Sequence, residues 1–159
     1  MGDFNIRELT SADIDILNKF WEKLSSSDKS ISKLYDLKSD LSIMKEELLS
    51  SKSGSVILGN IDEADENLLR GIASLDLLDY VRGWLTFLVV LPQYRKKGIG
   101  NELIKKSESI FKQNGKYIFR APTPKFFISV RALLEKNGYQ QLRIGQSGFV
   151  MYEKRIKQS

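Results

Sequence analysis

The segment from Val90 to Asn101 carries the side chains whose types and spacing best suit the binding of an anion. It reads Val-Leu-Pro-Gln-Tyr-Arg-Lys-Lys-Gly-Ile-Gly-Asn, so an apolar run ends at Pro92 and a basic turn leads to two glycines. Amides at the start of a helix attract anions, because they lack partners within the helix and the helix dipole lies behind them. Glycine lets a phosphate approach the backbone, and the cations of Arg95, Lys96 and Lys97 strengthen the attraction. The segment predicts a diphosphate-binding turn.

Two other phosphate-binding loops do not fit this segment. A dinucleotide-binding fingerprint needs a third glycine where Leu103 stands, and an acidic residue about 20 positions further on, where Arg120 stands. A Walker loop needs Gly-Lys followed by Ser or Thr, and the sequence holds no such triplet. The turn therefore belongs to neither type.

The residue inventory excludes several kinds of catalysis. The 159 residues include no histidine and no cysteine. This excludes Ser-His-Asp and Cys-His nucleophile pairs, the usual zinc sites and any disulfide framework. It also removes the side chain most often used as a general acid or base near neutral pH. Catalysis has to use carboxylates, hydroxyls, Tyr, Lys, Arg, backbone amides or water.

Composition and net charge indicate which classes of binding partner to expect. Hydrophobic residues make up 42% of the chain and charged residues 28%, and the net charge is +5. A basic excess favours anionic partners. We expect no nucleic acid, because a binder needs aromatic residues interleaved with Lys and Arg on an exposed sheet, and here the aromatic residues look buried. No apolar stretch approaches the ~20 residues that span a bilayer, and no basic and apolar leader is seen. We expect a cytoplasmic protein without a membrane partner.

The elements that must position the turn follow from the spacing of apolar residues. Helical spacing predicts helices over 14–24, 37–48, 99–114 and 127–136, and Thr10 with Asp13 resembles a capping box before the first. The polar stretch 25–32 predicts a loop. Short turns between strands predict an antiparallel meander within a mixed sheet, and we expect one α/β (α+β) domain over 1–159. Extended patterns predict strands over 4–9, 56–58, 68–77, 84–91, 117–120, 141–144 and 149–153.

Two stretches resemble the GNAT superfamily of N-acyltransferases. The run from Arg95 to Gly100 resembles that family's Arg/Gln-x-x-Gly-x-Gly/Ala signature, and Val90 to Pro92 is similar to the Val-x-Pro that precedes it. The run Arg131 to Tyr139, with Glu-Lys-Asn-Gly-Tyr at its end, is similar to the family's later helix. The resemblance is specific over residues 68–152 and covers only the order of elements before that. It implies the GNAT fold, a mostly antiparallel mixed sheet flanked by about four helices.

The resemblance further implies acetyl-coenzyme A as the cofactor. Backbone amides from Arg95 to Asn101 would bind its pyrophosphate, while the strand that ends at Val90 would part from strand 117–120 and pair with the pantetheine arm. The backbone of Val90 would also polarise the thioester carbonyl, as in an oxyanion hole. Lys125 and Arg131 would lie near the adenosine and its 3′-phosphate. The cofactor-binding candidates are Leu88, Val89, Val90, Arg95, Lys96, Lys97, Gly98, Ile99, Gly100, Asn101, Lys125 and Arg131.

The general acid departs from the family pattern. The family's later helix often carries an early Asn, and a Tyr that protonates the departing thiolate four residues before the Gly. Counting back from Gly138, these positions hold Phe127 and Leu134. The acid is therefore missing, displaced or replaced by water, and Tyr117 and Tyr139 are the nearby phenols.

The general base has several candidates. Many relatives carry a carboxylate on the central strand, where this chain offers only Thr86 as a polar side chain. Asp76 and Asp79, near the end of the preceding strand, are alternatives at an acceptor cleft. Arg120 would hold an acidic acceptor, a phosphate of the cofactor or a surface carboxylate. The catalytic candidates are thus Thr86, Asp76 and Tyr117.

Two functions remain open at this point. The first is an N-acetyltransferase in which a primary amine of a peptide or small molecule attacks acetyl-coenzyme A directly, with no covalent enzyme intermediate. The second is a GNAT-fold module that binds acyl-coenzyme A and transfers the acyl group poorly, because the Tyr and the strand carboxylate are missing. No metal is expected. The resemblance allows a homodimer, since dimers are frequent in that family.

Overall fold

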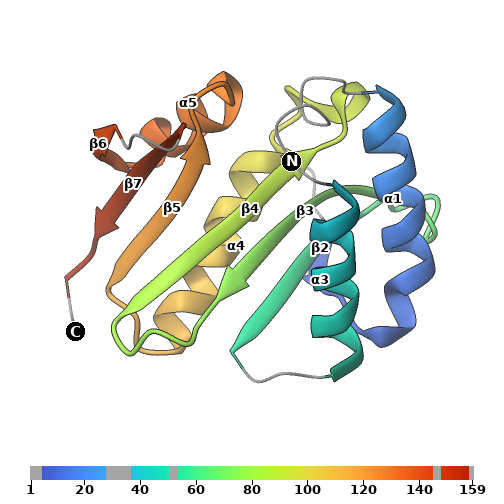
Figure 1. Ribbon diagram of the computed structural model, residues 1–159, viewed down its shortest axis with the longest axis horizontal. Helices are drawn as coiled ribbons and strands as arrows, with labels where there is room; N and C mark the ends of the chain where they lie inside the picture. Colours follow the sequence, from blue (N-terminus) through green and yellow to red (C-terminus); the bar gives the residue numbers. More distant parts are fainter. Residues whose placement is uncertain (1–4, 28–36, 51–53, 145–147, 158–159) are drawn as a thin grey trace.

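The computed structural model describes residues 5–27, 37–50, 54–144 and 148–157. These residues form a seven-stranded sheet in the order β1-β2-β3-β4-β5-β7-β6, with helices on both faces (Figure 1). The strands are β1 (Ile6–Glu8), β2 (Ser55–Ile61), β3 (Leu69–Asp76), β4 (Arg82–Val90), β5 (Ile118–Pro124), β6 (Gln140–Ile144) and β7 (Phe149–Arg155). The helices are η1 (Ser11–Asp13), α1 (Ile14–Ser27), α3 (Leu37–Ser50), η2 (Pro92–Tyr94), α4 (Ile99–Gln113) and α5 (Ile128–Lys136).

The sheet confirms the predicted class. Strands β2, β3 and β4 form the expected antiparallel meander, and β5, β7 and β6 pair antiparallel beyond it. The single parallel pairing among the described residues joins β4 to β5, and α4 lies on the crossover between them. This connection places the end of β4 and the start of α4 next to each other.

Two hydrophobic clusters hold the helices against the sheet. One face packs against α1 and α3 through fully buried side chains such as Leu17, Phe20 and Ile72. The other face packs against α4 and α5, where Leu103 and Leu134 are fully buried. In Figure 1, α1 and α3 lie in front of the sheet and α4 lies behind it. The site described below opens where β4 separates these two layers.

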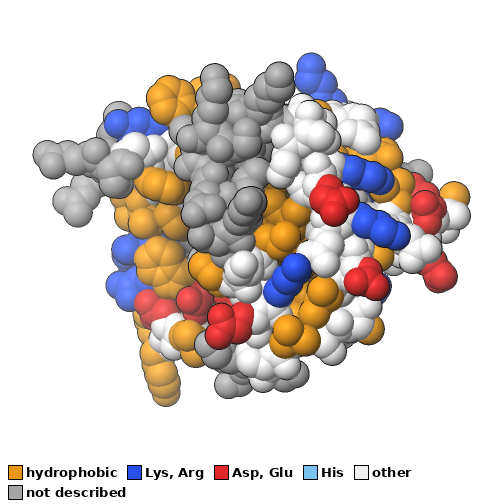
Figure 2. Space-filling model, turned by 45° about the vertical axis from the view of Figure 1, so that its right-hand side comes forward, with side chains coloured by type: hydrophobic (Ala, Val, Ile, Leu, Met, Phe, Trp, Pro, Cys, Tyr) orange, Lys and Arg blue, Asp and Glu red, His pale blue; other side chains and the backbone are white. Residues whose placement is uncertain are grey.

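Helix α1 shows why the sequence folds in this way. Its buried residues recur at helical spacing, while Asp15, Lys19 and Glu22 are exposed on the opposite face. Figure 2 looks onto this side of the molecule, where acidic and basic side chains are interspersed. Before the helix, the Thr10 hydroxyl accepts a hydrogen bond from the Ala12 amide at 3.2 Å, and the Asp13 carboxylate accepts one from the Thr10 amide at 2.7 Å. The predicted capping box is thus confirmed.

Several element ends differ from the prediction. Helix α1 continues through Ser25 to Ser27, and these serine hydroxyls donate hydrogen bonds to carbonyls about one turn earlier, as Ser25 does to Trp21 at 2.8 Å. The rest of the predicted loop over 25–32 lies outside the described residues, as does the start of the predicted strand over 4–9. Strand β2 is longer than predicted and runs from Ser55 to Ile61.

Strand β5 is the difference that matters for the site. It runs on to Pro124 rather than ending at Arg120, although it includes Pro122. A proline lacks the amide hydrogen that a ladder needs. Both prolines are tolerated because β5 still pairs with β7 on one edge, while its other edge has lost its pairing with β4.

Among the described residues, no helix is long and apolar enough to cross a bilayer.

Candidate functional site

Strands β4 and β5 form a fork. Their parallel ladder covers only the pairs Arg82 to Ile118, Gly83 to Phe119 and Trp84 to Arg120. Beyond these pairs the two strands part, as Figure 1 shows. The edge of β4 that faces the gap is therefore open to hydrogen bonds from a ligand along residues 85–90. This matches the predicted parting of the strand through Leu88, Val89 and Val90 from the strand that follows α4.

A β-bulge at Thr86 helps to create the fork. Leu75 pairs with Leu85 and Ser74 pairs with Phe87, so Thr86 has no partner on β3. Its hydroxyl donates a hydrogen bond to the Ser74 carbonyl at 3.1 Å, which holds the extra residue in place. A bulge bends a strand and increases its twist. The bend turns the second half of β4 away from β5.

The turn after β4 has the shape of an anion site. Lys96 has a φ of 63° and Gly98 a φ of 87°, both in the left-handed region. Gly98 is the N-cap of α4 and supplies no side-chain hydrogen bond to the helix. The first amides of α4 are therefore left for an external acceptor, and a left-handed residue before a helix curls such amides around an anion.

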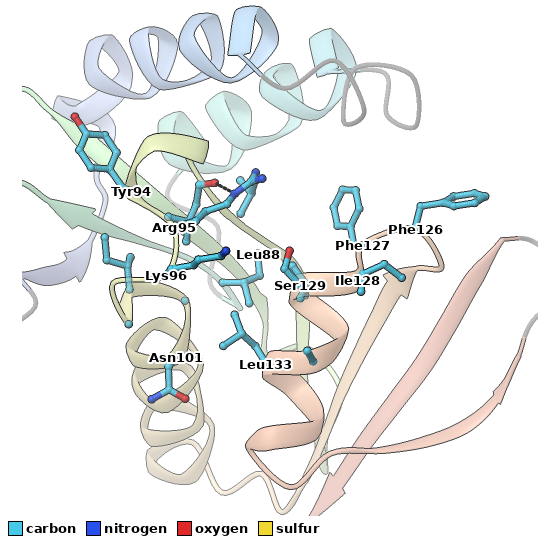
Figure 3. A pocket seen from close by; sticks show the side chains of 17 residues that line it. Leu88, Tyr94, Arg95, Lys96, Asn101, Phe126, Phe127, Ile128, Ser129 and Leu133 are labelled. Carbon is cyan, nitrogen blue, oxygen red and sulfur yellow. Dashed lines mark hydrogen bonds between the residues drawn. The ribbon is translucent and has the colours of Figure 1, made fainter.

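Arg95 crosses from this turn to the strand. Its Nε donates a hydrogen bond to the Val90 carbonyl at 2.8 Å. Figure 3 shows the Arg95 and Lys96 side chains extending from the turn toward Ser129 and Leu88. Both cations face the space between the turn and α5.

A cavity of about 590 Å³ fills that space. This is a usual size for a ligand site. Arg95 and Lys96 contribute positive charge, and the described residues that line the cavity include no carboxylate. The lining residues come from β4, the turn, α4 and the start of α5, namely Leu88, Val89, Val90, Tyr94, Arg95, Lys96, residues 98–101, residues 126–130, Ala132 and Leu133.

Most predicted cofactor-binding residues meet at this cavity, and three do not line it. Lys97 stacks on the Tyr94 ring with its Nζ 5.6 Å from the ring centre. Arg131 donates from Nε to the Tyr152 hydroxyl at 3.1 Å and from Nη1 to the Lys125 carbonyl at 2.9 Å. The Arg131 guanidinium therefore fastens the β5–α5 connection to the body of the protein. The predicted contacts of Lys97, Lys125 and Arg131 with the cofactor stay predictions.

Of the three catalytic candidates, only Thr86 lies at the fork. Asp76 ends β3 opposite Trp84, at the other end of β4 from Val90, and its carboxylate accepts a hydrogen bond from the Leu78 amide at 2.8 Å. Tyr117 lies at that same end, where its amide bonds to the Val81 carbonyl at 3.2 Å. The structure therefore does not bring Asp76 or Tyr117 to the cavity, and their catalytic roles stay predictions.

Asp79 lies at that far end too. Hydrogen bonds from the Val81 amide, and then from the Arg82 amide and side chain, lower the pKa of the Asp79 carboxyl to about 2. A group with so low a pKa takes up a proton poorly near neutral pH. Arg120 pairs with Glu153 on β7 at 2.8 Å, so its partner is a carboxylate of the protein, as in the third alternative, but a buried one rather than one on the surface.

The wall formed by α5 was largely missed by the sequence analysis. Phe127 is the N-cap of α5, packs partly on the α1 side and lines the cavity, while Leu134 is fully buried. Ser129 points into the cavity from the first turn, whereas the exposed Phe126 lies at its rim with the ring extending outward (Figure 3). Helical spacing predicted α5, but which of its residues face the cavity depends on where β5 ends. No group of metal-ligating side chains occurs among the described residues.

The sequence profile of the acetyltransferase (GNAT) family matches residues 15–139. The match spans more than half of the chain, and the chain therefore belongs to the GNAT acetyltransferase family. Acetyl-coenzyme A is the cofactor of this family, which confirms the predicted family and cofactor. No curated protein matches the chain in sequence.

Solved structures share the fold. The PaiA N-acetyltransferase of Thermoplasma acidophilum, in complex with coenzyme A, has a TM-score of 0.75 and 22% identity, covering 95% of this chain and 98% of that one. A GNAT acetyltransferase from Staphylococcus aureus Mu50 has a TM-score of 0.76 and 23% identity, covering 96% and 99%. An aminoglycoside 6′-acetyltransferase type Ii has a TM-score of 0.74 and 15% identity, covering 94% and 96%. At these identities the likeness is one of fold.

Proposed function

We propose that the protein is an N-acetyltransferase that brings acetyl-coenzyme A and a primary amine together in one ternary complex. The observation that carries the proposal is the cavity at the end of β4, where an uncapped helix start, two cations and an open strand edge meet. Acetyl-coenzyme A supplies a thioester whose carbonyl carbon accepts the amine. The two reactants need correct placement more than covalent help, and placement alone can lower a barrier greatly.

The turn fits the pyrophosphate of coenzyme A. The amides that follow Gly98 have no side-chain cap, and the cavity lining holds Arg95 and Lys96 without any carboxylate. Anions at such helix starts are stabilised by the amides and by the helix dipole together. We assign the pyrophosphate to residues 95–101, with Lys97 adding charge from its stack on Tyr94.

The open edge of β4 fits the pantetheine arm and the thioester. Backbone groups alternate along β4 between β3 and the gap, and the Leu91 amide bonds to Arg70 on β3. The backbone groups of Leu88 and the amide of Val90 therefore face the strand that has moved away, and they can pair with the amides of the arm as a missing strand would. An amide of this edge then points at the thioester oxygen and stabilises the negative charge that develops there. The Arg95 bond to the Val90 carbonyl fixes this end of the edge.

Thr86 is the polar side chain best placed for the amine. The proton of its hydroxyl is held by the Ser74 carbonyl, so its lone pairs are free to accept a hydrogen bond from the amine. The amine's own proton passes to water. Peptide amino groups, lysine side chains, polyamines and aminoglycosides are all candidate acceptors of this kind.

The second candidate is a coenzyme A-binding module that transfers the acetyl group poorly. It is favoured by the absence of any carboxylate among the described residues that line the cavity, and by the buried Leu134 where the family often has Tyr. The two functions differ only in the acyl-transfer step.

Calorimetry with coenzyme A, together with thiol release from acetyl-coenzyme A over a panel of primary amines, tests both candidates. The chain has no cysteine, so every thiol detected comes from the cofactor. We expect binding and transfer to at least one amine. Binding without transfer to any amine favours the module, and absence of binding overturns both candidates.

A further inference from the structure

A second, small cavity lies within the fork itself. Its volume is about 20 Å³, which is room for about one water molecule or methyl group. It shares Leu88, Phe127 and Val130 with the large cavity, so it continues that cavity inward between β4 and β5. Of the described residues that line it, Thr86 and Thr123 alone carry a hydroxyl and none carries a charge. A group delivered along β4 reaches this space last.

The two hydroxyls of the fork cavity differ in their bonding. The Thr86 hydroxyl donates to a carbonyl of the neighbouring strand β3 at 3.1 Å, and Thr86 is exposed. Thr123 is only 3% exposed, and its hydroxyl donates to the carbonyl of Ala121, two residues earlier on β5, at 3.3 Å. A good hydroxyl bond is 2.5–3.0 Å long, so this one is weak. Buried polar groups normally find a better partner, and the cavity offers a place for one.

Thr123 faces the α5 layer. Side chains alternate along a strand, and Phe119 and Ala121, on the same face of β5, belong to the cluster that contains Leu134. Leu134 and Thr123 line the same small cavity from α5 and from β5. Leu134 stands where the family often has Tyr and so supplies no hydroxyl, but Thr123 on β5 places a hydroxyl in the same small cavity.

We propose that the Thr123 hydroxyl donates a hydrogen bond to the sulfur of coenzyme A and stabilises the thiolate as it leaves. The inference rests on the proposed function. The amine nitrogen forms a bond to the carbonyl carbon, the carbon–sulfur bond breaks, and its electron pair goes to sulfur. The proton of the amine is lost to water, and the thiolate takes up a proton from water afterwards. Thr123 keeps its own proton throughout, because it acts as a hydrogen-bond donor.

The test compares Thr123→Val with Thr123→Ser. Valine keeps the branched shape and removes the hydroxyl, whereas serine keeps the hydroxyl. A hydrogen bond to a charged group is worth about 1.5–3 kcal/mol, so we expect Thr123→Val to lower kcat by about tenfold or more. Thr123→Ser should keep a kcat close to that of the wild-type protein, and the KM for acetyl-coenzyme A should change little in either variant. The control is Ser107→Ala, which removes another buried hydroxyl, one that bonds to Leu103 within α4 away from the fork.

A binding measurement decides the proposal without turnover. Coenzyme A and desulfo-coenzyme A are titrated by calorimetry at about pH 7, where the thiol is protonated, and at about pH 10.5, well above the pKa of about 8.5 of a cysteine thiol, so that the less acidic thiol of coenzyme A is ionised too. If Thr123 donates to sulfur, the preference of the wild-type protein for coenzyme A grows by about tenfold as the thiol ionises. In Thr123→Val the preference should change little with pH.

A preference that does not grow in the wild-type protein overturns the role of Thr123, even if a variant fails to fold. Unchanged kcat in a folded Thr123→Val overturns it too, and leaves the proposed acetyltransferase intact. Growth of the preference that is lost in Thr123→Val, in a protein that acetylates no amine, supports the Thr123 contact and removes the proposed transfer, whereas growth that persists in Thr123→Val overturns the role of Thr123. The two proposals therefore fail separately.

Discussion

Nε of Arg95 lies 2.8 Å from the carbonyl oxygen of Val90, so the first basic residue of the turn is bonded to the last residue of β4. The bond spans the point where the strand ends and the cavity begins. It fixes the guanidinium beside the open strand edge, where an anion held by the α4 amides would meet it. The cation and the strand edge are thus one structural unit.

Replacing Arg95 with Gln should weaken coenzyme A binding. The change removes a cation from the cavity and a charge-assisted hydrogen bond worth about 1.5–3 kcal/mol, so we expect the Kd to rise by about tenfold or more. Calorimetry at low and moderate salt measures the effect, and the variant should depend less on salt because one charge is gone. Lys97→Gln is the control, since Lys97 stacks on Tyr94 and does not line the cavity. Equal losses in the two variants would show that only net charge matters.

Replacing Gly98 with Ala should weaken coenzyme A binding more than it destabilises the fold. Gly98 has a φ of 87°, where an alanine costs about 1–2 kcal/mol. It also places a methyl group at the start of α4, where the phosphate must approach.

Gly115→Ala is the matched control for Gly98→Ala. Gly115 has a φ of 75° and nothing within 4 Å of an added Cβ, so it suffers similar strain away from the cavity. Urea unfolding should show similar losses of stability in both variants. Calorimetry should show weaker coenzyme A binding in Gly98→Ala alone. Equal affinities in the two variants would mean that Gly98 only allows the left-handed backbone conformation and does not make room for the phosphate.

The turn was predictable because all of its signals are local. A switch from apolar strand to helical spacing, two glycines and three cations occur within residues 90–101, and the structure joins them in the same order. Lys96 is the exception, because no propensity predicts a left-handed lysine with a φ of 63°. The closure of the turn between β4 and α4 imposes that conformation.

The far wall of the cavity was not predictable in the same way. Pro122 and Pro124 signal the end of a strand, yet β5 continues through both because one of its edges is open. The fork itself removes the usual objection to proline, and a fork is a relation between distant segments. The phase of α5, and hence the exposure of Ser129 to the cavity, follows from that strand end.

The positions of Asp76 and Tyr117 show a second reason why site residues could not all be predicted from the sequence. Both lie next to the right strands in sequence but at the wrong end of β4 for the cavity. In a hairpin the end of β3 meets the start of β4, so Asp76 falls beside Trp84 and not beside Val90. Strand direction, more than residue type, decides which polar side chains reach a site.

Replacing Thr86 with Val should lower kcat by about threefold to tenfold and leave the Kd for coenzyme A nearly unchanged. The Thr86 hydroxyl gives its proton to the Ser74 carbonyl and keeps its lone pairs for the amine, and one such bond is worth about 0.5–1.5 kcal/mol. Thr86→Ser should recover the rate. Steady-state kinetics with the best amine, with urea unfolding alongside, separates this role from a purely structural one. A loss of stability with unchanged kcat would mean that the Thr86 hydroxyl only stabilises the β-bulge and takes no part in catalysis.

Replacing Asp13 with Asn should make the stability of the protein less dependent on pH in the acid range. The side chain of Arg7 holds the Asp13 carboxylate through two hydrogen bonds of 2.8 Å and lowers the pKa of that carboxyl. Because the folded pKa lies below the unfolded one, the stabilisation is fully present above the unfolded pKa and is lost as pH falls through the folded pKa. Asparagine can still accept the bond from the Thr10 amide, so the variant keeps that cap and loses the charge.

The size of this effect is limited by solvent. The Arg7 side chain is 45% exposed and that of Asp13 is 10% exposed, so we expect a difference of only about 1 kcal/mol near neutral pH. Urea unfolding of the wild-type and Asp13→Asn proteins from about pH 7 to about pH 3 should show the two stabilities converging as Asp13 becomes protonated. Arg7→Gln should reproduce the convergence, because it removes the partner that lowers the pKa. A difference that persists unchanged at the lowest pH would mean that the carboxyl acts through its shape and its bond to Thr10 rather than through its charge.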